Sequence, residues 1–296
     1  MTIDRRRLRA FGATALAACT LWVAAATSPL HAEGAGPMSA WIEGYNSRVR
    51  IMAGHDGSGA NRQLTAGVEI ETKPDWKTYW RNPGDAGVPP NFDWSRSENV
   101  AAVKVGYPPP SRLVDKSGTT IGYLGRVVFP AVVTPADPSK PVRLRLAIEY
   151  GVCKDICVPA QAEAEIDLPP GGAMAMPREL VEAVAALPRP AGHGRPGDPV
   201  VKNVRVTLGG GAPQIVIDVA VPGGARDADA FLVAEDGGFV PLPEREITSA
   251  NGSDTGIARF VVDLGKDVDL KELAGKSVFA TITGPKGATE LAIPIR

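Results

Sequence analysis

Apolar and polar residues alternate along several stretches of the first half of the chain. From position 64 to 71, and again from 142 to 152 and from 160 to 168, every second residue is apolar. Most of the residues between them are charged, polar or glycine. Alternation of this kind is typical of antiparallel strands that pack one face on a core and leave the other face wet.

The second half of the chain shows the same short strands, separated by Gly and Pro turns. The expected strands lie at 204–208, 215–221, 231–233, 260–264, 278–283 and 291–293. Regular short strands with frequent turns favour an immunoglobulin-like sandwich. We therefore predict an all-β protein with two immunoglobulin-like β-sandwich domains; nothing in the second half indicates its function.

A Pro- and Gly-rich linker separates the two halves. Its breaker clusters, 168–172 and 187–192, bracket one helical stretch at 177–187 that carries an apolar face and has proline in its first turn. That face comprises Leu180, Val181, Val184 and Leu187. All Trp and Tyr residues lie at or before position 150, which indicates separate cores. The expected boundaries are 33–170 for the first domain, 171–198 for the linker with its docking helix, and 199–296 for the second domain.

The first 32 residues have the pattern of an export signal. Four arginines precede an apolar run, and Leu30-His31-Ala32 forms a small-residue cleavage site. We therefore expect a periplasmic protein, with a lipoprotein anchored through Cys19 as the alternative. No other stretch has the roughly 20 apolar residues of a membrane helix. Without this segment 28 basic and 32 acidic residues remain, a net charge of −4, so we expect no nucleic-acid partner.

After signal removal, Cys153 and Cys157 are the only cysteines expected in the chain. Strand parity places both on the wetter face, at the two ends of a three-residue loop if the flanking strands form a hairpin. An extended chain would separate them by about 13 Å, beyond the roughly 4.4 to 6.8 Å that a disulfide tolerates, so the loop must turn. We predict a partly exposed disulfide at the tip of a hairpin.

Three roles remain open for this pair. As a staple, a bond that closes about five residues adds only about 2 kcal/mol. As a metal site, two thiolates suit Cu(I), whereas Zn(II) needs four ligands and only His55 and His193 remain, both expected to be solvated loop residues. A short, exposed disulfide is of the reducible type, which favours redox exchange. No cofactor is expected.

An aromatic stretch from 74 to 94 is either core packing or a platform beside the thiols. Together with the cysteine segment, its motifs resemble the periplasmic N-terminal (alpha) region of the DsbD/ScsB family of thiol:disulfide interchange reductases. The resemblance covers about 41–170, and the C-x3-C spacing is that of the suppressor-of-copper-sensitivity type. The motifs are Trp76 to Gly87, Trp94, Tyr107 to Arg112, Gly122-Tyr123, Val127 to Pro130, and Cys153 to Pro159.

The resemblance implies that the domain passes electrons through its cysteine pair from a membrane donor to periplasmic partners. Cys157 would attack the partner's disulfide, and Cys153 would resolve the mixed disulfide. The expected partners are a periplasmic thioredoxin-fold protein and a separate membrane thiol-electron transporter, with protein-disulfide reductase-type activity. The competing hypothesis is a non-enzymatic Cu(I)-binding or interaction module of copper tolerance. The residues expected to cap the pair or to meet a partner are Trp76, Tyr79, Trp80, Thr120, Ile121, Gly122 and Tyr123.

Overall fold

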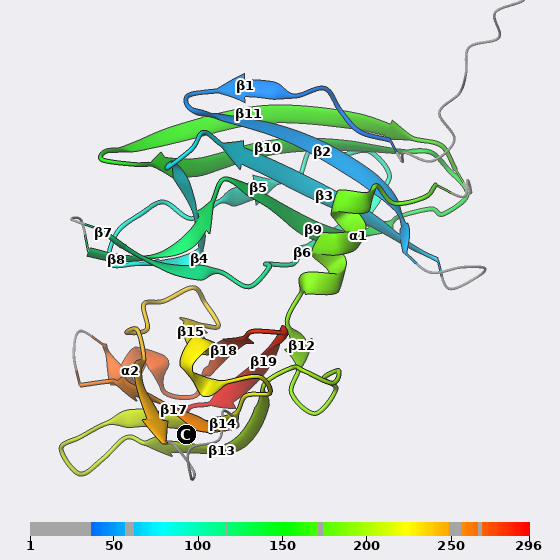
Figure 1. Cartoon of the computed structure of the whole chain (residues 1–296). Helices are drawn as coiled ribbons and strands as arrows, with labels where there is room; N and C mark the ends of the chain where they lie inside the picture. The colour runs from blue at the N-terminus through cyan, green and yellow to red at the C-terminus, as the bar shows by residue number, and fades with distance from the viewer. Residues whose placement is uncertain (1–36, 57–61, 116–117, 171–173, 249–255, 266–267) are drawn as a thin grey trace, which may run out of the picture. The chain divides into compact units, whose positions relative to one another are not determined.

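Two β-sheets enclose the core of the first part of the chain, which we call the first sandwich (Figure 1). The computed structural model describes residues 37–56, 62–115, 118–170, 174–248, 256–265 and 268–296. In these residues one sheet has the order β1-β2-β3-β9-β6. Its strands are β1 (Ile42–Gly44), β2 (Ser47–Asp56), β3 (Gln63–Thr72), β9 (Arg126–Pro135) and β6 (Val100–Val105).

The facing sheet has the order β11-β10-β4-β8-β7, and β5 also pairs with β10. Its strands are β11 (Cys157–Leu168), β10 (Val142–Cys153), β4 (Lys77–Gly84), β8 (Gly118–Leu124), β7 (Ser111–Asp115) and β5 (Asn91–Asp93). The strands β10 and β11 pair antiparallel along all 12 residues of each, which confirms the two alternating segments predicted from the sequence. Their alternate apolar residues, from Leu144 to Ile166, lie in the core.

Strand β3 departs from its predicted half-buried character, because both of its faces are covered. Glu69 is 0% exposed, although its position in the alternation indicated a wet face. Helix α1 (Arg178–Ala186) packs on this side, and Leu180 comes so close to Gly67 that an added Cβ would lie 2.9 Å from it. Glu69 accepts hydrogen bonds from Arg50, at 2.6 Å, and from Arg126. A buried ion pair thus replaces the solvent that the pattern suggested.

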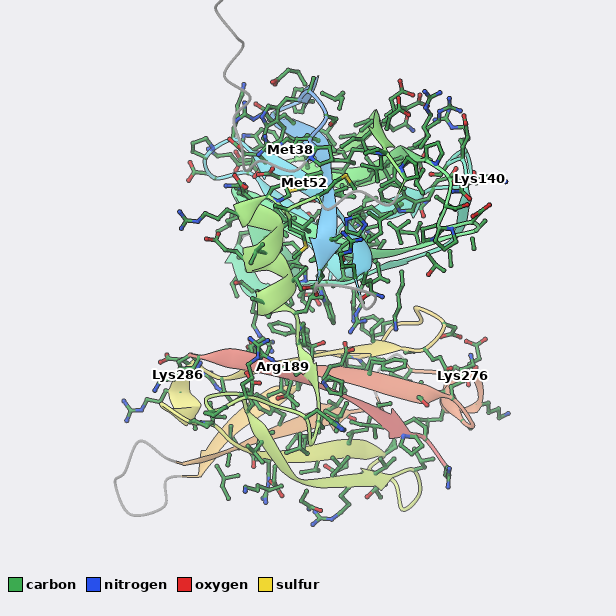
Figure 2. The ribbon with its side chains drawn as sticks, turned by 90° about the vertical axis from the view of Figure 1, so that its right-hand side faces the viewer. Met38, Met52, Lys140, Arg189, Lys276 and Lys286 are labelled. Atoms are coloured by element: carbon green, nitrogen blue, oxygen red, sulfur yellow. A yellow bond between two sulfur atoms is a disulfide. The ribbon has the colours of Figure 1, made fainter. Side chains whose placement is uncertain are left out.

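Helix α1 is the docking helix predicted for the linker. It packs with Met52, which is 0% exposed, and with Met38, which pairs with Met52 across a β-bridge (Figure 2). Its buried residues are Leu180 and Ala183, whereas Val181 is 46% exposed, so the buried face is rotated from the predicted one.

Two further sheets, both within the described residues, form the second sandwich. One has the order β12-β19-β18-β15 and the other β13-β14-β17-β16, which together with the first sandwich confirms an all-β, immunoglobulin-like fold. Short helices η2 (Ala225–Asp227) and α2 (Leu270–Leu273) connect strands. The strands are β12 (Arg189–Pro190), β13 (Val200–Thr207), β14 (Gln214–Ala220), β15 (Asp229–Ala234), β16 (Glu244–Thr248), β17 (Ile257–Asp263), β18 (Ser277–Gly284) and β19 (Gly287–Pro294).

The described residues from 37 onward belong to one compact unit, and side chains of β4 contribute to the contact between its two sandwiches. The Asn82 side-chain amide donates a buried hydrogen bond to the Leu232 carbonyl at 2.7 Å. The ring of Trp80 lies 6.0 Å from that of Phe231, which joins the first core. The prediction of two separate cores is therefore not fully correct, because Phe231 of the second sandwich packs in the core of the first.

Within the described residues, no helix is long and apolar enough to cross a membrane. The predicted signal segment, with Cys19, lies outside the described residues.

Candidate functional site

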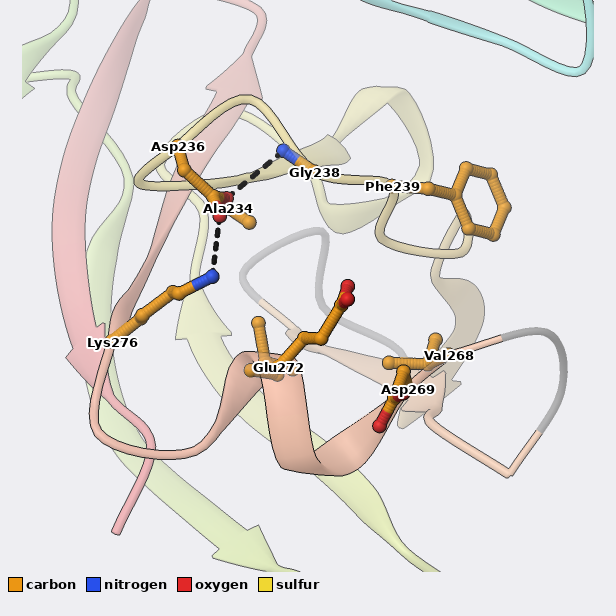
Figure 3. A pocket seen from close by; sticks show the side chains of 9 residues that line it. Ala234, Asp236, Gly238, Phe239, Val268, Asp269, Glu272 and Lys276 are labelled. Atoms are coloured by element: carbon orange, nitrogen blue, oxygen red, sulfur yellow. Dashed lines mark hydrogen bonds and ion pairs between the residues drawn. The ribbon is translucent and has the colours of Figure 1, made fainter.

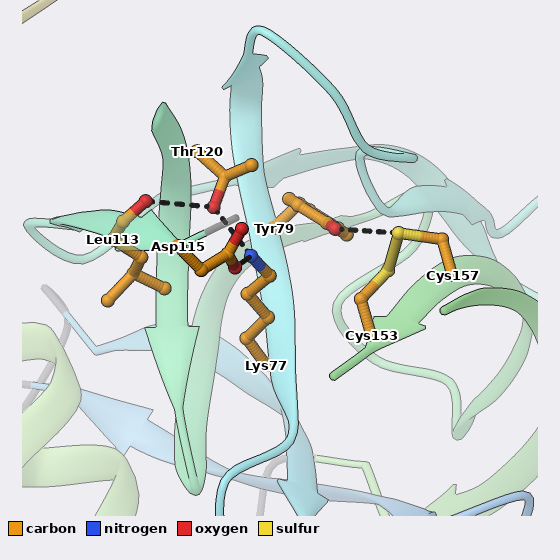
Figure 4. The surroundings of a disulfide bond; sticks show 7 residues. All are labelled: Lys77, Tyr79, Leu113, Asp115, Thr120, Cys153 and Cys157. Atoms are coloured by element: carbon orange, nitrogen blue, oxygen red, sulfur yellow. Dashed lines mark hydrogen bonds and ion pairs between the residues drawn. A yellow bond between two sulfur atoms is a disulfide. The ribbon is translucent and has the colours of Figure 1, made fainter. Parts of the chain in front are cut away.

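The two cysteines meet at the tip of the β10–β11 hairpin (Figure 4). Cys153 ends β10 and Cys157 begins β11; they are register partners, joined by a disulfide with their Cα atoms 4.2 Å apart. A hydrogen bond of 3.2 Å from the Lys154 amide to the Ile156 carbonyl closes the loop between them. The predicted hairpin disulfide is therefore confirmed.

The two cysteines differ in their exposure to solvent. Cys157 is exposed, as predicted, but Cys153 is only 1% exposed. The prediction that both lie on a wet face is thus wrong for Cys153. The end of β10 pairs with β4 at Lys77, and the Tyr79 ring lies against Gly151, so a neighbouring strand covers this face. An approaching molecule meets Cys157 first.

Tyr79 is the side chain of β4 that reaches the disulfide. Its hydroxyl lies 3.1 Å from Cys157 Sγ, and the residue is 1% exposed. A disulfide sulfur carries no hydrogen, so the hydroxyl is the donor. Burial, with a smaller contribution from the negative charge of Asp115, raises the pKa of Tyr79 to about 12. The hydroxyl therefore keeps its proton at neutral pH.

Two glycines border the Tyr79 ring on opposite edges. A Cβ added to Gly87 would lie 2.3 Å from Cε1, and one added to Gly151 would lie 3.0 Å from Cδ2. Gly87 also has a φ of +136°, a backbone conformation that favours glycine. We call these two residues the glycine seat of Tyr79.

A buried cation lies two residues before Tyr79 on the same strand. The Lys77 ammonium donates to Asp115 at 2.5 Å and to Thr120 Oγ1 at 2.9 Å, and the residue is 5% exposed (Figure 4). Residues two apart on a strand share a face, so Lys77 and Tyr79 project to the same side of the sheet. Sequence reasoning missed Lys77 and Gly87; the alternation of Lys77 with Tyr79 was the one available signal.

The rim around Cys157 combines apolar and charged residues. Ile156, in the loop, is 61% exposed. Lys154 forms an ion pair with Asp75 at 3.1 Å, which connects the loop to the start of β4. Trp76, one of the predicted surface aromatics, is half-buried and packs edge-on against Tyr45 with ring centroids 5.5 Å apart.

Other predicted cap residues lie in the core. Trp80 and Ile121 are 0% exposed and Tyr123 is 9% exposed, because they belong to the side of the sheet that faces the sandwich interior. Gly122 packs on the backbone of Thr78, where an added Cβ would lie 2.1 Å from the carbonyl oxygen. Trp80, Ile121 and Tyr123 therefore offer no cap over the sulfurs, whereas Gly122 is the register partner of Tyr79.

The histidines considered as metal ligands lie elsewhere. His55 is a half-buried residue of β2, not of a loop, and its Nδ1 accepts a hydrogen bond of 3.5 Å from the Met174 amide. His193 is exposed in a turn. Over the described ranges, no three or more His, Cys, Asp or Glu residues group to form a metal site.

A shallow pocket in the second sandwich has an acidic and apolar lining (Figure 3). Phe239 on its wall is 51% exposed, and Asp236 is paired with Lys276 at 2.5 Å. Nothing in its geometry suggests a reaction, so the hairpin tip is the candidate site.

Comparison with known families supports a class for this site. Residues 52–169 match the family described as thiol:disulfide interchange protein DsbD, N-terminal. The matched region is similar to a DsbD N-terminal domain. The cysteine hairpin and β4 both lie inside the matched range.

The structure is similar to the crystal structure of the N-terminal periplasmic domain of ScsB from Proteus mirabilis. The TM-score is 0.60 and the sequence identity 20%, over 88% of this chain and 99% of the other. At this identity the similarity shows a common fold, which extends beyond residues 52–169 into the second sandwich. A comparison with curated proteins gave no match.

Proposed function

We propose that this protein is a periplasmic thiol:disulfide interchange protein. Cys153 and Cys157 pass electrons from a membrane thiol donor to periplasmic partners of the thioredoxin fold. The match of residues 52–169 to the DsbD N-terminal family and the fold similarity to the periplasmic domain of ScsB support this function. The single observation that carries it is the hairpin disulfide with one exposed and one buried cysteine.

The exchange starts from the reduced pair. The Cys157 thiolate attacks one sulfur of the partner's disulfide, and the partner's other sulfur leaves as a thiolate. The Cys153 thiolate then attacks the Cys157 sulfur, which restores the hairpin disulfide and releases the partner as a dithiol. Two electrons and two protons reach the partner, and the membrane donor returns two electrons by the same steps in reverse.

Exposure supports this division of roles. A partner's sulfur must come within bonding distance of the attacking sulfur, and of the two cysteines only Cys157 is exposed. Cys153 needs only to reach Cys157, its register partner across the hairpin. The buried cysteine therefore suits the resolving step.

Trapping of the mixed disulfide tests the proposal. We expect Cys153→Ser to accumulate a covalent complex with an oxidised thioredoxin, seen on a non-reducing gel, because the resolving thiol is missing. Cys157→Ser should give none, and the double variant is the control for non-specific adducts. A complex formed only by Cys157→Ser would reverse the two roles.

A different result would favour metal binding over redox exchange as the function of the cysteine pair. That result is trapping by neither single variant, together with Cu(I) binding by the reduced wild type that both variants lose. Two thiolates suit Cu(I), so this outcome has a chemical basis.

A further inference from the structure

The strand next to the cysteines, β4, carries a further polar group at the disulfide. Tyr79 contributes a buried hydroxyl 3.1 Å from Cys157 Sγ. Within the described residues no such hydrogen bond reaches Cys153, whose register partner on β4 is Lys77. The hydroxyl is thus a second difference between the two sulfurs, besides their exposure.

The glycine seat fixes the direction in which the hydroxyl points. Gly87 and Gly151 leave no space for a Cβ beside the ring, so the ring fills the gap between them. A ring held in this way does not need to reorganise when the sulfur changes its charge. Such preorganisation makes a donor effective at the moment when charge develops.

The hydroxyl is also a donor in every state of the cycle. Its pKa of about 12 keeps it protonated when the neighbouring sulfur becomes a thiolate. Hydrogen bonds to an ionised acceptor are shorter and roughly twice as strong as those between neutral groups. Reduction therefore strengthens the contact.

We infer that Tyr79 is a catalytic residue of the exchange, whose hydroxyl stabilises the thiolate of Cys157 and so makes Cys157 the sulfur that carries the negative charge. This inference rests on the proposed exchange function. A stabilised thiolate is more abundant at neutral pH, where it acts as the nucleophile. It is also the better leaving group when the donor reduces the disulfide.

The charged groups around Cys157 come from three elements, and most are paired. The hairpin loop carries Lys154 and Asp155, and Lys154 is held by Asp75 ahead of β4. Lys77 of β4 is held by Asp115 of β7. Since each cation has a carboxylate beside it, neither supplies an unbalanced positive charge to the thiolate. The neutral hydroxyl is left as the specific stabilising group.

Tyr79→Phe removes the hydroxyl and keeps the ring. In a Cys153→Ser background, the rate of Cys157 alkylation by iodoacetamide is followed against pH by peptide mass spectrometry. We expect the variant to raise the pKa of the Cys157 thiol by about one unit, a tenfold change in its ionisation constant. The matched control is Tyr150→Phe, a buried tyrosine on β10 whose hydroxyl bonds Ser47 at 2.8 Å, and it should leave this pKa unchanged.

The equilibrium with glutathione gives a second readout in proteins that keep both cysteines. Tyr79→Phe should make the disulfide harder to reduce, by a factor that grows with pH toward about tenfold above the thiol pKa. If Tyr79→Phe is unfolded by circular dichroism, Gly87→Ala, which displaces the ring, should shift both quantities in the same direction.

The inference would be overturned if the folded variant had the wild-type pKa at Cys157 and the same equilibrium with glutathione as the wild type at every pH. Alkylation needs no partner protein, so this result is separable from a failure of the proposed function. If the proposed function fails, the wild type exchanges with no thioredoxin-fold protein, whatever the pKa of its Cys157 thiol.

Discussion

Replacement of both cysteines asks whether the hairpin disulfide serves chemistry or stability. In Cys153→Ser with Cys157→Ser, the lost crosslink joins residues separated by 4 positions. For a closed loop of about five residues, the chain-entropy estimate is about 7 cal/mol/K, or about 2 kcal/mol at 25 °C. The two strands also pair along all 12 residues without the bond, so this value is an upper bound. At about 2 to 4 °C per kcal/mol, we expect a melting temperature lowered by no more than about 8 °C.

The assay is thermal unfolding followed by far-ultraviolet circular dichroism. Oxidised wild type is compared with the double variant and with reduced wild type, which lacks the bond but keeps both side chains. The last two should melt together, slightly below the first, while exchange with thioredoxin is lost in the double variant alone. A loss of more than roughly 15 °C in both, about twice the entropic bound, would refute the reasoning and identify a structural staple.

Three further predictions concern the elements around the site. Glu69→Gln should cost about 3 kcal/mol in urea unfolding, because it leaves two arginines without their buried carboxylate, whereas Glu71→Gln, from a half-exposed pair, should cost less than about 1 kcal/mol. Asn82→Ala should cost about 2 kcal/mol, since the Leu232 carbonyl loses its buried donor. The pKa of Tyr79 is raised from 10.0 to about 12, so its contribution to stability is complete below pH 10 and is lost as the pH rises to 12. In the same urea titration, the free energy of unfolding of Tyr79→Phe should therefore fall less over this pH range than that of the wild type.

The hairpin could be predicted from the sequence because its determinants are local. Alternation across 142–152 and 160–168 defines two strands, and the three residues between the cysteines allow only a tight turn. Register then follows from the turn, and it places Cys153 opposite Cys157.

Burial could not be predicted in the same way, because it depends on strands distant in the sequence. Cys153 and Glu69 both occupy polar-phase positions of alternating strands, and both are at most 1% exposed. Cys153 is covered by β4. Glu69 is covered by α1, and its charge is neutralised by Arg50 and Arg126. Parity along a strand indicates which residues share a face, but it does not indicate what packs on that face.

The aromatic motif shows the same limit within a single strand. Alternation along β4 separates Tyr79 from Trp80, but the alternation alone does not indicate which of the two lies at the disulfide. In the structure Trp80 faces the core beside Phe231, while Tyr79 enters the glycine seat and reaches Cys157. One face of β4 therefore contacts the second sandwich, and the other face contacts the reactive sulfur. The position of the hydroxyl that we propose stabilises the thiolate is in this way fixed by the packing of the whole strand.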